Sequence, residues 1–127
     1  MKRKRKKSKH KKLPDLVYLR DHFVYDPIEG KLKDSDTLEE VGWNDDKGYR
    51  CVRIQKRVWK AHRIMFFMYH QRDPGTKVID HIDGDKGNNQ IFNLRAVTHR
   101  ENLRNTQRQR DAGNVPSLER NAYKALL

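Results

Sequence analysis

The amino-acid sequence predicts a small α+β domain made of short β-hairpins and helices. Two pairs of β-rich segments are each joined by a short turn, and one apolar segment has the length of a helix. Signals for a strand, a polar loop, a second strand and a helix then follow one another in the C-terminal half. The chain has 127 residues, which is the size of one domain.

The N-terminal half is expected to form one short helix and two hairpins. Apolar spacing favours a helix over residues 14–22, since proline is accepted at a first helical position. FVYDPIEGKLK predicts strand, turn and strand, because Asp26 followed by proline favours a turn that Gly30 ends. After a polar loop, YRCVRI and RVWKA predict a second hairpin that turns at Gln55 and Lys56.

The C-terminal half is expected to contain the main buried helix, HRIMFFMYHQ, and two short strands, VIDHI and LRAV. Thr98 is a candidate N-cap for a helix through HRENLRNTQRQR, with Glu101 as the partner residue of a capping box. Gly113 and Pro116 should break that helix, and Ser117 should cap a last short one.

The aromatic residues of the middle segment are expected in the core. We predict burial for Trp59, Phe66, Phe67 and Tyr69, which lie in the second hairpin and the main helix. Trp43 lies in the polar loop, where it would either pack or stack on a base.

Most of the positive charge lies at the N-terminal end. The first twelve residues hold nine Lys or Arg and no acid, whereas the other residues hold 20 basic and 17 acidic side chains. A charge run of this kind is expected to be a disordered tail. It would contact a polyanion through counterion release, or it would serve only for solubility. An anionic membrane would attract it too, but no amphipathic helix or lipidation signal accompanies it.

Several classes of protein and site are excluded. The longest apolar run, IMFFMY, is too short to cross a bilayer, and no apolar segment of a secretory signal follows the basic start. The single cysteine, Cys51, excludes an internal disulfide and a Cys-rich zinc cluster, so we expect a reducing, cytoplasmic location. Counted from Asp83, a calcium loop would need Gly and Glu where Asn88 and Leu94 stand.

One window, VIDHIDGDKGNNQIFNLRAVTHRENLRN, concentrates three Asp, two His and five Asn. Asp80 and His81 are expected at the end of its first strand and Asn93 at the start of its second. Because neighbours in a strand point to opposite faces, Asp80 and His81 serve one site only if the pleat breaks there. On the following helix, three residues share one face: His99, Asn102 and Asn105.

This window resembles the core of the HNH endonucleases, the ββα-metal or His-Me finger nucleases. It shares the family's order of D-H-I-[ND]-G-D, then N-x-x-x-N-L-R, then Asn nine residues after the second motif Asn. GYRCVRIQKRVWKAHRIMFFMYH and VYDPIEGKL are also similar to these proteins, so the resemblance spans about residues 17–106. It is strongest to the small phage and intron-encoded, homing-endonuclease-like members, although Gln90 replaces an Arg that many relatives carry.

The resemblance implies a ββα-metal core that hydrolyses phosphodiester bonds in DNA and nicks one strand per event. His81 matches the general base that activates water, and Asn93 matches the residue that braces the loop and orients the base. Asp80 and Asn102 match the ligands of one divalent cation, for which two oxygen donors suit Mg²⁺ or Mn²⁺. The products would carry 5′-phosphate and 3′-hydroxyl ends.

Basic side chains are expected to bind the DNA. The candidates are Lys2, Arg3, Lys4, Arg5, Lys6, Lys7, Arg95, Arg100 and Arg104. Arg100, Arg104 and Arg108 form a helical stripe whose middle points away from Asn102, so it is either a solvated face or a contact to another part of a wrapped duplex. The supporting candidates are His62, Arg63, His99 and Asn105. For His62, a structural role with a hydrogen bond under the site is favoured over catalysis.

Four ranges organise the chain in this interpretation. They are a basic tail at 1–12, helices and hairpins at 13–76, the ββα-metal core at 77–110, and a loop with a short helix at 111–127. The expected partner is double-stranded DNA, with no membrane and no protein partner beyond a monomer or weak dimer. The alternative is a non-catalytic nucleic-acid-binding protein that keeps the fold, although Asp80 and His81, which a decayed nuclease would lose first, are both present.

Overall fold

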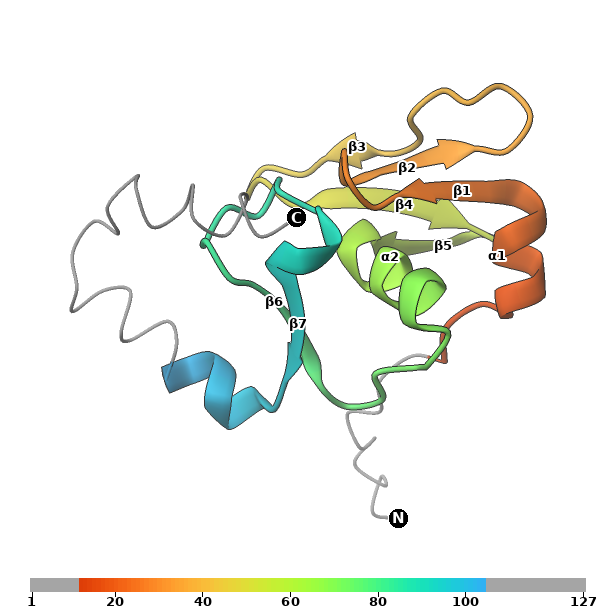
Figure 1. Ribbon diagram of the computed structural model, residues 1–127. Helices are drawn as coiled ribbons and strands as arrows, with labels where there is room; N and C mark the ends of the chain where they lie inside the picture. Colours follow the sequence, from red (N-terminus) through yellow and green to blue (C-terminus); the bar gives the residue numbers. More distant parts are fainter. Residues whose placement is uncertain (1–11, 105–127) are drawn as a thin grey trace, which may run out of the picture.

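A computed structural model of the chain describes residues 12–104 (Figure 1). The first eleven residues of the tail, Asn105, and the predicted helix break and last helix beyond it lie outside this range. No helix in the described part is long and apolar enough to cross a membrane.

The first helix, α1, spans Leu16–His22 and starts two residues later than predicted. The cause is Asp15, whose carboxylate accepts the backbone N–H of Val17 and so caps the helix after Pro14. The chain then passes directly into strand β1, Phe23–Asp26.

Both predicted hairpins are present. Strand β1 pairs antiparallel with β2, Lys31–Asp34, and β4, Arg50–Ile54, pairs antiparallel with β5, Arg57–Lys60. In the second turn Gln55 and Lys56 both have positive φ, as a two-residue hairpin turn requires. The predicted polar loop also contains a short strand, β3, Trp43–Asn44, which pairs with the start of β4.

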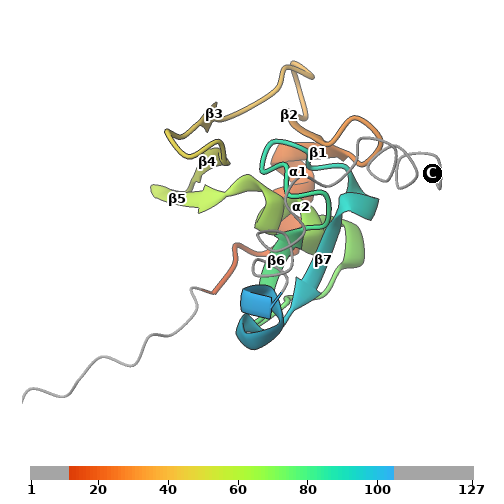
Figure 2. The ribbon, with the colours of Figure 1, turned by 90° about the vertical axis from the view of Figure 1, so that its left-hand side faces the viewer.

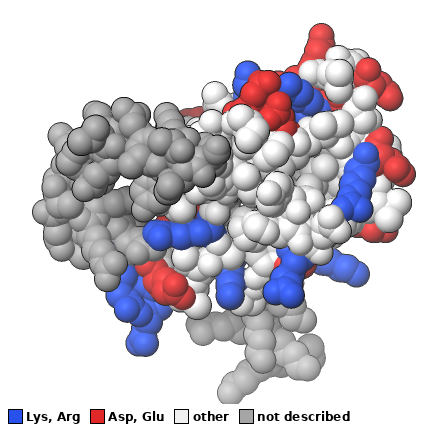
Figure 3. Space-filling view, in the orientation of Figure 1, with Lys and Arg blue, Asp and Glu red and all other residues white. Residues whose placement is uncertain are grey.

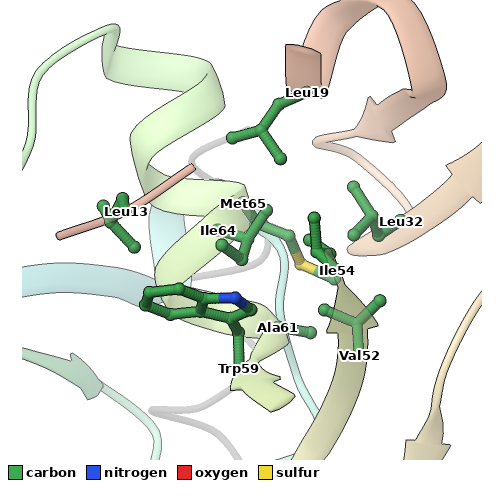
Figure 4. Packing of buried hydrophobic residues seen from close by; sticks show 9 residues of the cluster. All are labelled: Leu13, Leu19, Leu32, Val52, Ile54, Trp59, Ala61, Ile64 and Met65. Atoms are coloured by element: carbon green, nitrogen blue, oxygen red, sulfur yellow. The ribbon is translucent and has the colours of Figure 1, made fainter. Parts of the chain in front are cut away.

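Helix α2, Ala61–His70, is the central element of the fold. It contacts β1, β4 and β5 on one side and β6 on the other, so it separates the N-terminal hairpins from the C-terminal one (Figures 1 and 2). The buried cluster combines residues of α2 with residues of the elements packed against it: Leu13, Leu19, Leu32, Val52, Ile54, Trp59, Ala61, Ile64 and Met65 (Figure 4).

The predicted burial of the aromatic residues is only partly correct. Trp59 is buried, and Phe66 and Phe67 are half-buried. Tyr69 is 50% exposed, so its predicted burial is wrong. It lies in the last turn of α2, where its ring contacts the exposed His70 at 5.1 Å instead of the core.

The C-terminal part has the predicted order of strand, loop, strand and helix. Strands β6, Val78–His81, and β7, Leu94–Val97, form an antiparallel pair, and the short 3₁₀ helix η1, Ile91–Asn93, leads into β7. Residues 99–104 are helical. Thr98 and Glu101 exchange the reciprocal bonds of a capping box, with Glu101 N–H donating to Thr98 Oγ1 at 3.1 Å. The predicted α+β class is confirmed.

Candidate active site

His81 is the last residue of β6 and is 6% exposed. It pairs with Leu94 in the ladder, and its Nε2 lies 2.8 Å from Oδ1 of Asn89. Its ring meets the ring of His62 edge to face at 4.8 Å, and the ring of Tyr49 lies 6.3 Å away. The imidazole is therefore fixed by one hydrogen bond and two rings at the end of a strand.

Asn89 was not singled out by the sequence analysis, although it is the hydrogen-bond partner of His81. It is 3% exposed, and its backbone carbonyl accepts the hydroxyl of Tyr25 at 2.6 Å. Burial, and then the charge of Asp26, raise the pKa of Tyr25, so its hydroxyl stays protonated as a donor. The pair of asparagines at 88–89 was the available signal, but Tyr25 lies 64 residues away in sequence.

The β1–β2 turn lies against the same loop. Gly30 has a φ of +74°, and a Cβ at this position would lie 2.5 Å from the backbone N of Gln90. The side chain of Gln90 donates to the carbonyl of Ile28 at 2.7 Å, which gives a local role to the residue that departs from the family pattern. The N-terminal hairpin thus positions the loop that holds His81.

Asn93 is 2% exposed and joins both ends of the loop between β6 and β7. Its Oδ1 accepts the backbone N–H of Asp83 at 3.0 Å, and its Nδ2 donates to Asp83 Oδ1 and to the carbonyl of Asn88. Asn88 completes the network by donating from Nδ2 to Asp83 Oδ2. All of these bonds stay within the loop and none reaches the ring of His81, so Asn93 supports the shape of the loop.

His62, at the start of α2, is buried beneath His81 as predicted, but the expected hydrogen bond is missing at Nδ1. Among the described residues this buried nitrogen has no hydrogen-bond partner. Burial, with smaller contributions from the charges of His81, Lys60 and Arg63, lowers the pKa of His62 to about 3. His62 is therefore a neutral ring packed against His81.

Asp80 and His81 lie on opposite faces of the β6–β7 hairpin, so the break in the pleat that a shared site would need is absent from this ladder. Both residues belong to the regular ladder, paired with Arg95 and Leu94, and the chain turns only after His81. Oδ2 of Asp80 accepts from Nε and Nη2 of Arg95 at 3.1 and 2.9 Å. Arg95, predicted to bind DNA, is thus ion-paired with the predicted metal ligand.

The helical residues 99–104 start at the end of the hairpin opposite the His81 loop, because Val97 pairs with Val78. Asn102 is half-buried, whereas His99, Arg100 and Arg104 are exposed. Among residues 12–104, no group of three or more His, Cys, Asp or Glu is arranged as a metal site. Arg63, the remaining supporting candidate, donates to the carbonyls of Gly75 and Lys77 and so fixes the segment before β6.

Residues 60–104 match the family model described as HNH endonuclease. These residues belong to the HNH endonuclease family. The matched HNH segment contains α2, the β6–β7 hairpin and the helical residues 99–104, and it is shorter than the range over which the sequence resembles the family.

The fold around the HNH segment is also similar to a solved structure described as "DNA binding and cleavage by the HNH homing endonuclease I-HmuI". The TM-score is 0.59 at 23% sequence identity, which shows a common fold. The likeness covers 86% of this chain, and the chain spans 64% of the length of that structure. No curated protein matches the chain at significant similarity.

Proposed function

We propose that the protein is a metal-dependent endonuclease that hydrolyses phosphodiester bonds in DNA and cuts one strand per event. The observation that carries the proposal is His81, a buried imidazole held by Asn89 at the end of a strand in the HNH segment. The similar solved structure concerns a DNA-cleaving protein of the same family, which supports the choice of DNA as substrate.

His81 would accept the proton of the attacking water. Imidazole is the side chain that changes protonation near neutral pH, so it suits this role. When Nε2–H donates to Oδ1 of Asn89, the lone pair of Nδ1 is left to accept a proton. Burial keeps His62 uncharged, so no second imidazolium opposes the charge that forms on His81.

Asp80 and Asn102 would hold the metal. Because Asp80 and His81 lie on opposite faces of the regular β6–β7 ladder, the proposal requires a local change of the pleat at the end of β6 when metal and DNA bind. A carboxylate and a carboxamide oxygen fit a hard cation such as Mg²⁺ or Mn²⁺. When bound, such a cation stabilises negative charge on the phosphate and on the leaving 3′ oxygen. Asn93 would keep the loop, and with it Asn89 and His81, in place.

Cleavage of supercoiled plasmid with Mg²⁺ or Mn²⁺, with and without EDTA, tests the proposal. We expect relaxed circles before linear DNA, and no product with EDTA. His81→Ala should abolish cleavage and leave DNA affinity within about twofold, because affinity comes mainly from phosphate contacts elsewhere. His22→Ala, at the exposed end of α1, is the matched control and should cleave normally. Full activity of His81→Ala would reject His81 as the base.

One observation favours the alternative of a non-catalytic DNA-binding protein. The Asp80 carboxylate is already neutralised by Arg95, with an Nη2–Oδ2 distance of 2.9 Å. If the wild-type protein binds duplex DNA but gives no product with either cation over a broad range of pH, this alternative replaces the nuclease.

A further inference from the structure

Two lysine ammonium groups lie over the ring of Tyr49, but only one of them has an acidic partner. Nζ of Lys60 is 4.8 Å and Nζ of Lys86 is 4.9 Å from the ring centroid. Lys60 also lies 2.6 Å from Oδ2 of Asp45, a bond that raises the pKa of Lys60 and lowers that of Asp45 to about 2. Lys86 forms no ion pair with any carboxylate in residues 12–104.

The acids nearest to Lys86 in sequence bind the loop instead. Asp83 Oδ1 accepts the N–H of Asp85, and its Oδ2 accepts the amide of Asn88. Asp85 Oδ1 accepts the N–H of Gly87 at 2.9 Å. These bonds fix the backbone on both sides of Lys86, so its exposed side chain extends from a well-braced loop with its positive charge uncompensated by an acid.

Tyr49 brings this charge close to His81. Its backbone N–H donates to Asp45 Oδ1 at 2.8 Å and its carbonyl accepts from Asp45 N–H, so the position of the ring is fixed by the preceding turn. The ammonium of Lys86 lies 4.9 Å from the Tyr49 ring centre, and that ring centre lies 6.3 Å from the centre of the His81 ring. The ammonium is therefore within about 11 Å of the His81 ring centre.

We propose that Lys86 binds a phosphate of the DNA strand at the His81 site, and that Tyr49 holds its ammonium ready through a cation–π contact. The inference rests on the proposed function and adds a substrate-binding residue to it. A charge-assisted bond to a phosphate oxygen is stronger than the contact with the ring, so the ammonium turns to the phosphate when DNA arrives. Since the loop is already ordered, little entropy opposes this step.

Lys86→Gln tests the proposal, with Lys56→Gln as the control. Lys56→Gln also removes one positive charge, but in the β4–β5 turn, at the end of that hairpin away from Tyr49. We expect single-turnover cleavage by Lys86→Gln to fall on the order of tenfold. In a His81→Ala background, where DNA stays intact, Lys86→Gln should weaken duplex binding and make the log–log salt slope shallower by about 0.9, the contribution of one phosphate. Lys56→Gln should change neither value. Equal behaviour of the two variants in both measurements overturns the proposal.

Two substitutions of Tyr49 test the cation–π part. Tyr49→Leu removes the aromatic ring and should reduce cleavage as Lys86→Gln does. Tyr49→Phe keeps the aromatic ring and should retain most of the wild-type cleavage. Equal loss in both would show that the hydroxyl matters and the ring does not, against the proposal. If the wild-type protein never cleaves, the nuclease function fails, and the salt slope of binding still decides whether Lys86 contacts phosphate.

Discussion

The orientation of His81 depends on one carboxamide, Asn89, eight residues away and 2.8 Å from the ring nitrogen. Asn89 is in turn held by the hydroxyl of Tyr25 from the N-terminal hairpin. A neutral partner at this position orients the imidazole without adding a charge beside it. The chemistry proposed for His81 needs the neutral form of the ring, so this choice of side chain suits a base that works near neutral pH.

Asn89→Asp should move the pH dependence of cleavage. A carboxylate beside Nε2 stabilises the protonated ring, so cleavage by the variant should require a higher pH than cleavage by the wild type. In a plot of single-turnover rate against pH, the part where the rate rises with pH should move to higher pH by about one unit or more. Asn44→Asp, at an exposed site in β3, is the control. An unmoved limb would show that His81 is not the titrating base.

His62 should make the folded protein sensitive to acid. Its pKa is about 3 in the folded state against an ordinary value of 6.5, so the unfolded state binds more protons between these limits. This contribution to stability is present above pH 6.5 and is lost as pH falls toward 3. Urea unfolding should show a loss of about 2 kcal/mol between pH 7 and pH 4.5 from this group.

His62→Phe should remove this part of the acid sensitivity, because the variant has no group to protonate. It also removes a buried nitrogen that lacks a hydrogen bond, so stability at pH 7 should change little or rise. His70→Phe, at the exposed end of α2, should keep the acid sensitivity of the wild type. If all three proteins lose stability equally on acidification, His62 is not the group responsible.

Among the secondary-structure elements, those with local signals were predicted correctly. The turn at Gln55 and Lys56 and the capping box of Thr98 and Glu101 each depend on residues close in sequence, so the sequence itself reveals them. The start of α1 was misplaced by two residues because Asp15 and Pro14 are competing start signals. The two-residue strand β3 carries too short a pattern to be recognised.

The candidate site was less predictable because its contacts are long-range. The motif placed His81 and Asn93 near each other, but the tie from Tyr25 to Asn89 spans 64 residues and leaves no periodic signal. The pairing of Asp80 with Arg95 depends on the register of β6 and β7, which periodicity alone does not fix. Local patterns therefore predicted the elements, and packing decided which side chains meet.

Substitutions in the helical residues 99–104 test which side chain binds the metal. Asn102→Ala should lose Mg²⁺-dependent cleavage, because Asn102 is the half-buried residue that the family spacing matches to a ligand. Asn102→Asp and Asn102→His keep a donor atom and should retain part of the activity. His99→Ala, one turn earlier and exposed, is the matched control and should stay active. The reverse result, with His99→Ala inactive and Asn102→Ala active, would place the ligand one turn earlier.

Most of the net positive charge belongs to the first twelve residues, whereas basic and acidic residues are nearly balanced in the rest of the chain. On the face shown in Figure 3, the basic and acidic side chains of the described residues are interspersed and separated by uncharged surface. Some of the acids also neutralise nearby cations, as Asp45 does for Lys60 and Asp80 for Arg95. This face thus carries charges of both signs, whereas nine of the first twelve residues are Lys or Arg and none is acidic.

We therefore expect the N-terminal residues to supply most of the sequence-independent affinity for DNA. Replacing residues 2–12 by a Gly/Ser segment of equal length should weaken binding to any duplex and make the log–log salt slope shallower, by up to about eight if every cation neutralises a phosphate. The cleavage rate at saturating protein should change much less, because the side chains proposed for chemistry lie in the HNH segment. Fluorescence anisotropy with an unrelated duplex at several salt concentrations measures the slope. An unchanged slope would mean that these cations do not contact the DNA and that the affinity comes from the folded part.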